Sequence, residues 1–170
     1  MIYKLEKIKM LYHGTDAFFE QIDPMKGKRF KDFGRGFYTT TNLNQAIRWA
    51  QRRAEYSVAS SAYVYSFSIN HSGIKDCNVL ELLDYDENWL AYVTKCRKTN
   101  HSSEYDIIYD RMADGSIADV LDKYYMGNIS SKDALKQLSG WKQKNWDQYC
   151  FKTESSLGLL VRLEIEDVSV

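Results

Sequence analysis

The chain has 170 residues, of which 44% are hydrophobic and 27% are charged, a composition that indicates a globular rather than a disordered protein. Lysine plus arginine and aspartate plus glutamate both number 23, so the formal net charge is zero. This balance removes the bulk electrostatic argument for a nucleic-acid-binding protein, although it leaves room for a local basic patch. The cysteines show no CxxC spacing, which argues against a disulfide framework and against a zinc site.

The N-terminus and the hydropathy of the chain indicate a soluble protein. The segment MIYKLEKIKM interleaves charged and apolar residues and lacks the apolar core of a signal peptide. No stretch approaches the roughly 20 apolar residues that a membrane-spanning helix needs. We therefore expect a cytoplasmic protein that does not bind membranes and that forms a single domain over residues 1–170.

The first half of the chain alternates between strand-like and helical patterns. A short strand is expected over 8–13, ended by Gly14, and the aromatic and β-branched segment 36–40 predicts another. A helix is expected to begin after Asn42, which is a suitable N-cap. The apolar face of this helix consists of Leu43, Ala46, Ile47, Ala50 and Ala54. The segment 63–70 alternates large apolar with small polar residues and predicts a half-buried strand.

The second half mixes strands with amphipathic helices. Strands are expected over 78–82, 105–110, 147–153 and 159–168, and helices over 86–98, 116–127 and 130–140. The helix over 86–98 has acidic residues at its start and basic residues at its end, which suits the helix dipole. Because no regular βαβ alternation is visible, the pattern predicts an α+β domain with a mainly antiparallel sheet.

Three segments that lie far apart along the chain carry the candidate chemistry. They read YHGT at 12–15, GRGFYTTTNLNQAIRW at 34–49 and DQYCFKT at 147–153. In order and setting they resemble the three signature regions of the ADP-ribosyltransferase superfamily. The resemblance is to the branch with a His–Tyr–acid triad, which includes the poly(ADP-ribose) polymerases and diphtheria toxin. The chain is also similar to a group of small, uncharacterised, stand-alone bacterial proteins of this type.

The resemblance implies an ADP-ribosyltransferase fold with a split, mainly antiparallel sheet that binds the co-substrate NAD between its halves. By this likeness His13 would hydrogen-bond the ribose, and Thr15 would add a hydroxyl contact. Gly14 would offer its backbone N–H and C=O to the carboxamide, where a side chain would block the approach. Tyr38 would stack on the nicotinamide ring, with Trp49 as the second ring of an aromatic sandwich.

Gln148 departs from the family pattern, which usually has glutamate at this position. Glutamine can accept the ribose hydrogen bond, but it lacks the charge that stabilises an oxocarbenium-like transition state, a loss on the order of 2–4 kcal/mol. Asp147 cannot replace that charge, since neighbouring strand residues point to opposite faces. Asp110 and Asp114 are the nearest candidates, and each is also explained as a solvated loop acid or a helix cap. The transferase interpretation predicts that Gln148→Glu keeps or raises activity.

The function that the resemblance favours is mono-ADP-ribosylation of a macromolecular acceptor, protein or nucleic acid, with release of nicotinamide. His13, Tyr38 and Gln148 would be the catalytic residues, and no metal site is expected. By analogy the chain would be the toxin component of a bacterial toxin–antitoxin pair, with a cognate antitoxin as partner. The alternatives are an NAD glycohydrolase, a catalytically weak NAD-binding module, and an RNA 2′-phosphotransferase. The last would require basic residues around the site.

Each candidate residue also has a purely structural interpretation. His13 taken alone would be a satisfied core histidine, and Tyr38 a core aromatic of a strand. Trp49 would pack with the apolar face of its helix. A basic run would be a solvated loop or, alternatively, a contact to the cofactor's phosphates, and it consists of Lys26, Lys28, Arg29 and Lys31.

Overall fold

The structure of the protein is a computed structural model that describes residues 3–58, 61–99, 101, 103–113, 117–140 and 143–169. Its strands are β1 (Leu11–Thr15), β2 (Phe37–Thr39), β3 (Tyr63–Ile69), β4 (Val79–Leu82), β5 (Ile107–Ala113), β6 (Gln143–Phe151) and β7 (Leu160–Asp167). The α-helices are α1 (Leu43–Ser57), α2 (Glu87–Lys98), α3 (Ile117–Tyr125), α4 (Ser131–Ser139) and α5 (Glu154–Leu157). Short 3₁₀ helices are η1 (Lys4–Lys7), η2 (Pro24–Lys26) and η3 (His71–Asp76).

The strands form two separate sheets. Sheet 1 has the order β1-β3-β7 and is antiparallel throughout. Sheet 2 has the order β2-β6-β5-β4, and only its β4–β5 pair is parallel among the strands described. The two sheets touch at their edges through an isolated bridge, in which Tyr12 and Thr40 exchange backbone hydrogen bonds of 2.8 and 2.9 Å. The fold therefore confirms the predicted α+β class with a split, mainly antiparallel sheet.

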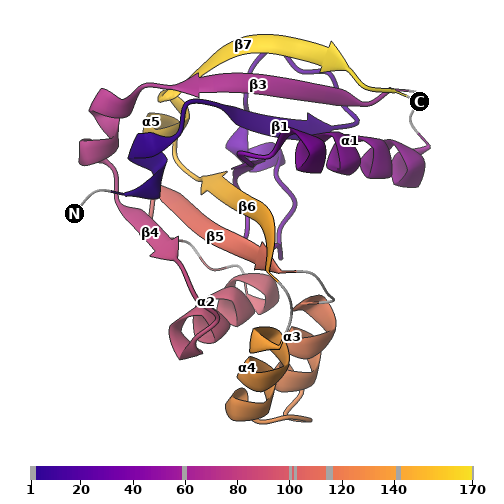
Figure 1. Cartoon of the computed structure of the whole chain (residues 1–170), viewed down its shortest axis with the longest axis vertical. Helices are drawn as coiled ribbons and strands as arrows, with labels where there is room; N and C mark the ends of the chain where they lie inside the picture. The colour runs from indigo at the N-terminus through magenta and orange to yellow at the C-terminus, as the bar shows by residue number, and fades with distance from the viewer. Residues whose placement is uncertain are drawn as a thin grey trace.

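The core lies between four layers. Helix α1 packs on one face of sheet 1 through small residues, which include Ala46, Ala50 and Val64. The other face of sheet 1 packs on sheet 2 through aromatic and aliphatic side chains, among them Leu11, Tyr65, Phe67, Ile107, Tyr149 and Phe151. Helices α2, α3 and α4 cover the far face of sheet 2 and gather at one end of the molecule (Figure 1).

Several predicted elements are confirmed with their local causes. The Asn42 side chain caps α1 by accepting a hydrogen bond of 3.1 Å from the Gln45 backbone N–H. The Asp86 and Ser130 side chains cap α2 and α4 in the same way. In β3 the predicted apolar face is confirmed, since Tyr65 and Phe67 lie in the core between the sheets. The strand is not half-buried as predicted, because Val64 on the opposite face is buried against α1.

Two predictions about the second half were wrong. Strands β4 and β5 are parallel and joined by α2, so the chain contains one βαβ unit that the sequence pattern did not indicate. Strand β5 continues to Ala113 rather than ending at 110, and β6 begins at Gln143 rather than at 147. Both strands are longer than predicted because Asp110 and Gln148 pair with each other inside the β5–β6 ladder, whereas polar residues in a sequence usually suggest the end of a strand. None of the described helices is long and apolar enough to cross a membrane.

Candidate functional site

A cavity of about 400 Å³ lies between residues of both sheets and of α1. Five of the six predicted site residues line it: His13, Gly14, Tyr38, Trp49 and Gln148. The sixth, Thr15, lines a neighbouring cavity of about 280 Å³ instead. The two cavities share the walls His13, Lys31, Tyr38 and Arg53. The three sequence segments therefore converge on one hollow, with Thr15 displaced to its neighbour.

His13 is held in one tautomer at the wall of the cavity. Its Nδ1 lies 2.6 Å from the backbone oxygen of Tyr38, and because a carbonyl only accepts, Nδ1 carries the proton. The imidazole stacks on Phe37 with a centroid distance of 4.3 Å. Burial lowers the pKa of His13 to about 4, so the ring is neutral at physiological pH. In this state Nε2 has a free lone pair and acts as an acceptor, as a contact to a ribose hydroxyl requires.

Gly14 turns its backbone toward the gap between the sheets. Tyr12 uses its N–H and C=O to bond Thr40 of the other sheet, and in a strand the groups two residues further on point the same way. The reason for glycine differs from the predicted one. A Cβ at this position would lie 2.0 Å from the Ala46 backbone oxygen, so close packing of α1 on β1 demands the glycine. The prediction that a side chain at this position would block a ligand is therefore not supported, because the Cβ would point at the backbone of α1.

Tyr38 is both a core residue and a wall of the cavity. It is 7% exposed and belongs to the cluster beneath α2–α4, so its structural interpretation is confirmed. Its hydroxyl donates to the Gly34 oxygen at 2.7 Å and accepts from the Phe33 N–H at 3.1 Å. The Lys31 ammonium lies over its ring, 4.8 Å from the centroid. The ring is thus fixed rigidly and presents a face that already attracts a cation.

Trp49 reaches the cavity from α1 and does not pack in the core with Ala46 and Ala50. Within the described part of the chain it makes no ring contact with Tyr38. The two aromatic rings therefore line one cavity without touching each other. The predicted aromatic sandwich would therefore form only with a ligand ring between the two side chains.

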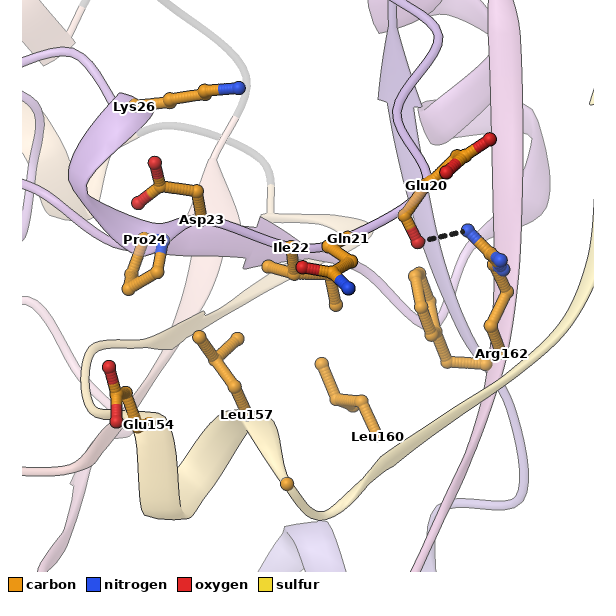
Figure 2. A pocket seen from close by; sticks show the side chains of 12 residues that line it. Glu20, Gln21, Ile22, Asp23, Pro24, Lys26, Glu154, Leu157, Leu160 and Arg162 are labelled. Atoms are coloured by element: carbon orange, nitrogen blue, oxygen red, sulfur yellow. Dashed lines mark hydrogen bonds between the residues drawn. The ribbon is translucent and has the colours of Figure 1, made fainter.

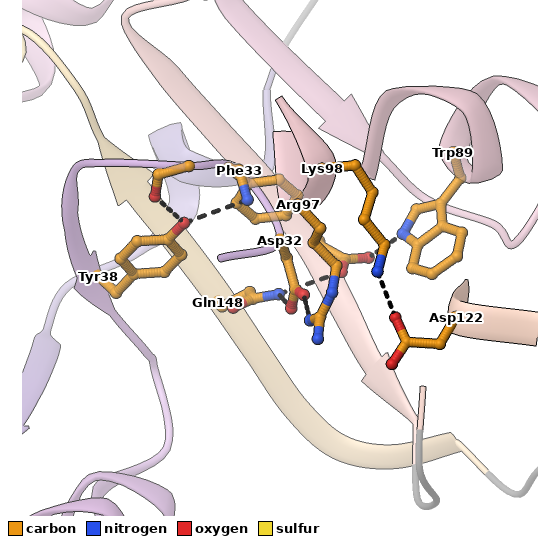
Figure 3. Close-up of polar contacts among 10 residues, drawn as sticks. Asp32, Phe33, Tyr38, Trp89, Arg97, Lys98, Asp122 and Gln148 are labelled. Carbon is orange, nitrogen blue, oxygen red and sulfur yellow. Dashed lines mark hydrogen bonds and ion pairs between the residues drawn. The ribbon is translucent and has the colours of Figure 1, made fainter. Parts of the chain in front are cut away.

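Gln148 lies between two carboxylates, as Figure 3 shows for its contact with Asp32. Its Nε2 donates to Asp32 Oδ2 at 3.1 Å and to Asp110 Oδ2 at 3.2 Å. Because both partners are acceptors, the side-chain amide has one orientation, and no described residue donates to its carbonyl oxygen. The Asp110 carboxylate also accepts from Trp89 Nε1 at 3.2 Å and is 1% exposed. The interpretation of Asp110 as a solvated loop acid or helix cap was therefore wrong, and Asp114 lies outside the described residues.

The two acids around Gln148 differ in their surroundings. Asp110 is buried beneath α2, and burial together with the charge of Asp32 raises the pKa of Asp110 well above its usual range. Asp32 lines the cavity and forms an ion pair with Arg97 of α2. Asp32 was not predicted as a site residue, because nothing in a loop acid signals a contact with a strand residue 116 positions away.

This environment reverses the expectation for Gln148→Glu. A glutamate would bring a third carboxylate within about 3 Å of two existing ones, and like charges at such distances cannot all remain ionised. Glutamine is thus the residue that fits between two acids, since its amide N–H groups satisfy both. We now expect the substitution to weaken rather than to restore the site.

The prediction for Asp147 is confirmed by its contacts. Its carboxylate accepts hydrogen bonds from the Thr40 hydroxyl at 2.8 Å, from the Thr41 N–H at 2.8 Å and from the Thr41 hydroxyl at 2.6 Å. It therefore stabilises the turn between β2 and α1, on the face of β6 opposite to Gln148. The buried amide of Gln45 donates to the Asp147 backbone oxygen at 2.8 Å and ties α1 to the same strand.

The walls of the 400 Å³ cavity carry more positive than negative charge. The basic side chains are Lys31, Arg52, Arg53 and Arg97, and the acidic one is Asp32. Of the predicted basic run, Lys31 lines both of these cavities, whereas Lys26 and Lys28 line the smaller one and not the 400 Å³ cavity. Arg53 also holds Asp16 in an ion pair of 2.8 Å. Such a surface attracts anionic ligands.

A larger hollow of about 780 Å³ lies elsewhere, between the segment around η2, the start of β7 and α5 (Figure 2). Arg162 fixes its rim by donating to the Glu20 backbone oxygen at 2.8 Å. No predicted site residue lines it, and its ionisable side chains are of mixed sign. Size alone therefore does not make it the functional site.

A family model described as "Protein of unknown function (DUF3990)" matches residues 9–161. The chain belongs to this family. No curated protein and no solved structure matches it. The DUF3990 description names no activity, so the likeness to ADP-ribosyltransferases stays a prediction.

What this DUF3990 protein can do chemically follows from its cavity. A neutral imidazole acceptor, the backbone of Gly14 at the edge of sheet 1, two separated aromatic rings and a cationic wall suit a ligand with hydroxyls, a flat ring and phosphates. Cys150 is no nucleophile candidate, because burial raises the pKa of its thiol to about 12. Among the described residues, no group of three or more potential metal ligands occurs.

Proposed function

We propose that the protein binds NAD in the 400 Å³ cavity and transfers its ADP-ribose group to a macromolecular acceptor. The observation that carries the proposal is the convergence of His13, Gly14, Tyr38, Trp49 and Gln148 on one hollow, although they come from three separate segments. Convergence of this kind is not required by core packing, since Trp49 leaves the apolar face of its helix to reach the cavity.

The side chains of the cavity fit the pyridine and ribose parts of NAD. A cation already lies over Tyr38, and the nicotinamide ring of NAD is itself positively charged, so it would replace the Lys31 ammonium on the same ring face. Gly14 would bond the carboxamide through its backbone. His13 Nε2 and the Gln148 carbonyl oxygen would accept hydrogen bonds from the ribose hydroxyls.

The cationic wall supports the binding of the two phosphates of NAD. Arg52 and Arg53 come from α1, as does Trp49, and Lys31 comes from the segment before β2 and lines the same cavity. Guanidinium groups bind phosphate oxygens in pairs and are suited to this position. Lys31, once displaced from Tyr38, would remain close enough to act on the same phosphates.

NAD supplies a glycosidic bond with a good leaving group. As this bond breaks, its electron pair goes to the nicotinamide nitrogen, which becomes neutral. The acceptor atom then bonds to the ribose carbon and loses a proton to solvent. The role of the protein is to hold the ring and the ribose in place and to exclude competing water. A role as the toxin of a bacterial pair, a cognate antitoxin and a cytoplasmic location stay predictions from the resemblance.

An RNA 2′-phosphotransferase is the second candidate, and a specific observation favours it. The basic residues that such an enzyme requires are present, as Lys31, Arg52, Arg53 and Arg97. The two aromatic walls, however, serve a flat ring better than a phosphate, so we rank this function below transfer from NAD.

The test is to incubate the purified protein with NAD and a cell lysate and to measure free nicotinamide and labelled macromolecule. Nicotinamide with labelled acceptor supports the transferase, and nicotinamide alone supports a glycohydrolase. Binding of NAD without either product supports a binding module, whereas loss of phosphate from a 2′-phosphorylated RNA that requires NAD, with the phosphate recovered on the ADP-ribose product, supports the phosphotransferase.

A pair of histidine variants makes this assay specific for the cavity. We expect His13→Ala to lower nicotinamide release about tenfold or more, the equivalent of one lost hydrogen bond. His71→Ala is the matched control, because the His71 ring also bonds a backbone oxygen, that of Ile8 at 2.7 Å, but lies outside the cavity. Equal loss in both variants would contradict the assignment.

A further inference from the structure

The sequence leaves the proposed site without the charge that a glutamate at position 148 would provide. The structure shows a carboxylate next to that position. Asp32 touches the Gln148 amide at 3.1 Å, and its side chain is 18% exposed on the wall of the cavity. Asp110 touches the same amide but is 1% exposed and does not line the cavity.

The two carboxylates therefore have different roles. Asp110 accepts hydrogen bonds from Trp89 and Gln148, so it fixes the orientation of the Gln148 amide from the buried side. Asp32 uses Oδ1 for its ion pair with Arg97 and Oδ2 for Gln148. Each carboxylate oxygen has a second lone pair, so Asp32 can still face a ligand. Figure 3 shows Asp32 between the Gln148 amide and the Arg97 guanidinium.

We infer that Asp32 is a catalytic residue that supplies the negative charge missing at Gln148, and that Asp110 is a positioning residue for the Gln148 amide. This inference rests on the proposed function. When the bond between ribose and nicotinamide breaks, positive charge develops on the ribose while the electron pair leaves with nicotinamide. A fixed carboxylate beside the residue that binds the ribose hydroxyl lowers the energy of that charge distribution. Asp32 itself gains and loses no atom or proton.

The arrangement also explains why glutamine is present. One glutamate in the usual place would act both as hydrogen-bond acceptor and as charge. Here the two tasks are separated: the Gln148 carbonyl accepts the hydroxyl, and Asp32 carries the charge. A glutamate at position 148 would repel the Asp32 carboxylate, whereas the glutamine amide donates a hydrogen bond to it.

The test compares neutral and charged replacements of Asp32 in the full-length chain. For Asp32→Asn and Asp32→Ser we expect kcat for nicotinamide release to fall about 10²–10³-fold. The dissociation constant for NAD, measured by calorimetric titration, should differ little between these variants and wild type, because the charge acts on the transition state. Asp32→Glu should recover most of kcat, since it restores the carboxylate.

The control is a second aspartate that pairs with the next residue of the same helix. Asp122 bonds Lys98 of α2 at 2.5 Å (Figure 3). Its side chain is 47% exposed and lies outside the cavity. Asp122→Asn removes a comparable ion pair with α2 and should keep wild-type kcat. Thermal unfolding of every variant identifies any that do not fold, and one folded neutral variant at Asp32 is sufficient.

The outcomes separate the two claims. Wild-type protein that releases no nicotinamide, whether or not it binds NAD, overturns the proposed function and, with it, this inference. Active wild-type protein with an equally active, folded Asp32→Asn or Asp32→Ser variant overturns the role of Asp32 alone. A loss of NAD binding that accounts for the whole loss of activity also overturns it, because a structural or binding role would then suffice.

Discussion

The two walls of the cavity hold a polar side chain each, and they hold it by different means. On sheet 1, His13 is surrounded by the rings of Phe19, Phe37 and Tyr65 and makes one short hydrogen bond to a backbone oxygen. On sheet 2, Gln148 lies between two carboxylates. The first wall presents a neutral acceptor in an aromatic setting, and the second presents charge. The two walls therefore offer a ligand different chemistry, because His13 is a neutral acceptor and Gln148 is bonded to two acids.

The same difference gives the walls opposite responses to pH. The folded-state pKa of His13 is lowered, so the unfolded chain binds a proton that the folded chain does not, and stability falls on acidification. The folded-state pKa of Asp110 is raised, so the folded chain holds the extra proton, and stability falls as pH rises above the usual aspartate range. Single variants on each wall should therefore remove opposite parts of the pH dependence.

The largest expected effect belongs to His13. Its pKa falls from 6.5 to about 4, so its contribution to stability is complete above 6.5 and is lost as the pH falls through that window. At about 1.4 kcal/mol per pKa unit, a difference of about 2.5 units amounts to a loss of at most about 3.5 kcal/mol. Urea unfolding of wild type and His13→Gln across this window measures it. If the free energy of unfolding of His13→Gln depends on pH as that of wild type does, the predicted difference between the two walls is contradicted.

A smaller effect is expected for Gln148→Glu on the opposite wall. The added carboxyl has two acids as neighbours, so we expect a loss of about 2 kcal/mol in the free energy of unfolding at neutral pH. The loss should shrink on acidification, because the folded state retains a proton on this cluster. Gln21→Glu, on an exposed loop residue, is the control. The measurement is the free energy of unfolding of both variants at neutral and acidic pH. A Gln148→Glu variant more stable than wild type would contradict the described charge arrangement.

Local patterns in the sequence predicted much of the fold. The Asn42 cap, the alternation in β3 and the charge distribution of α2 act over a few residues, so a single sequence displays them. The lengths of β5 and β6 were not predictable, because polar residues extend both strands only by bonding across the ladder. Local composition cannot show such a pairing.

The site shows the same division. The motif residues His13, Tyr38 and Gln148 were found through the order of three segments, and the structure places them on one cavity. Asp32 was missed because its partners, Gln148 and Arg97, are distant in sequence. Gly14 was found for the wrong reason, since its missing side chain makes room for α1. Contacts between distant segments, rather than motifs, decide these points.

The central claim, that NAD binds between these two walls, is tested most directly by NMR of protein with ¹³C-labelled methionine methyl groups. Met112 lines the cavity, whereas Met126 is 69% exposed and lies outside it. Titration with NAD should shift the Met112 methyl resonance saturably and leave that of Met126 in place, with Met112→Leu providing the assignment. A Met112 resonance that stays unchanged at NAD concentrations that saturate any other signal would contradict the account.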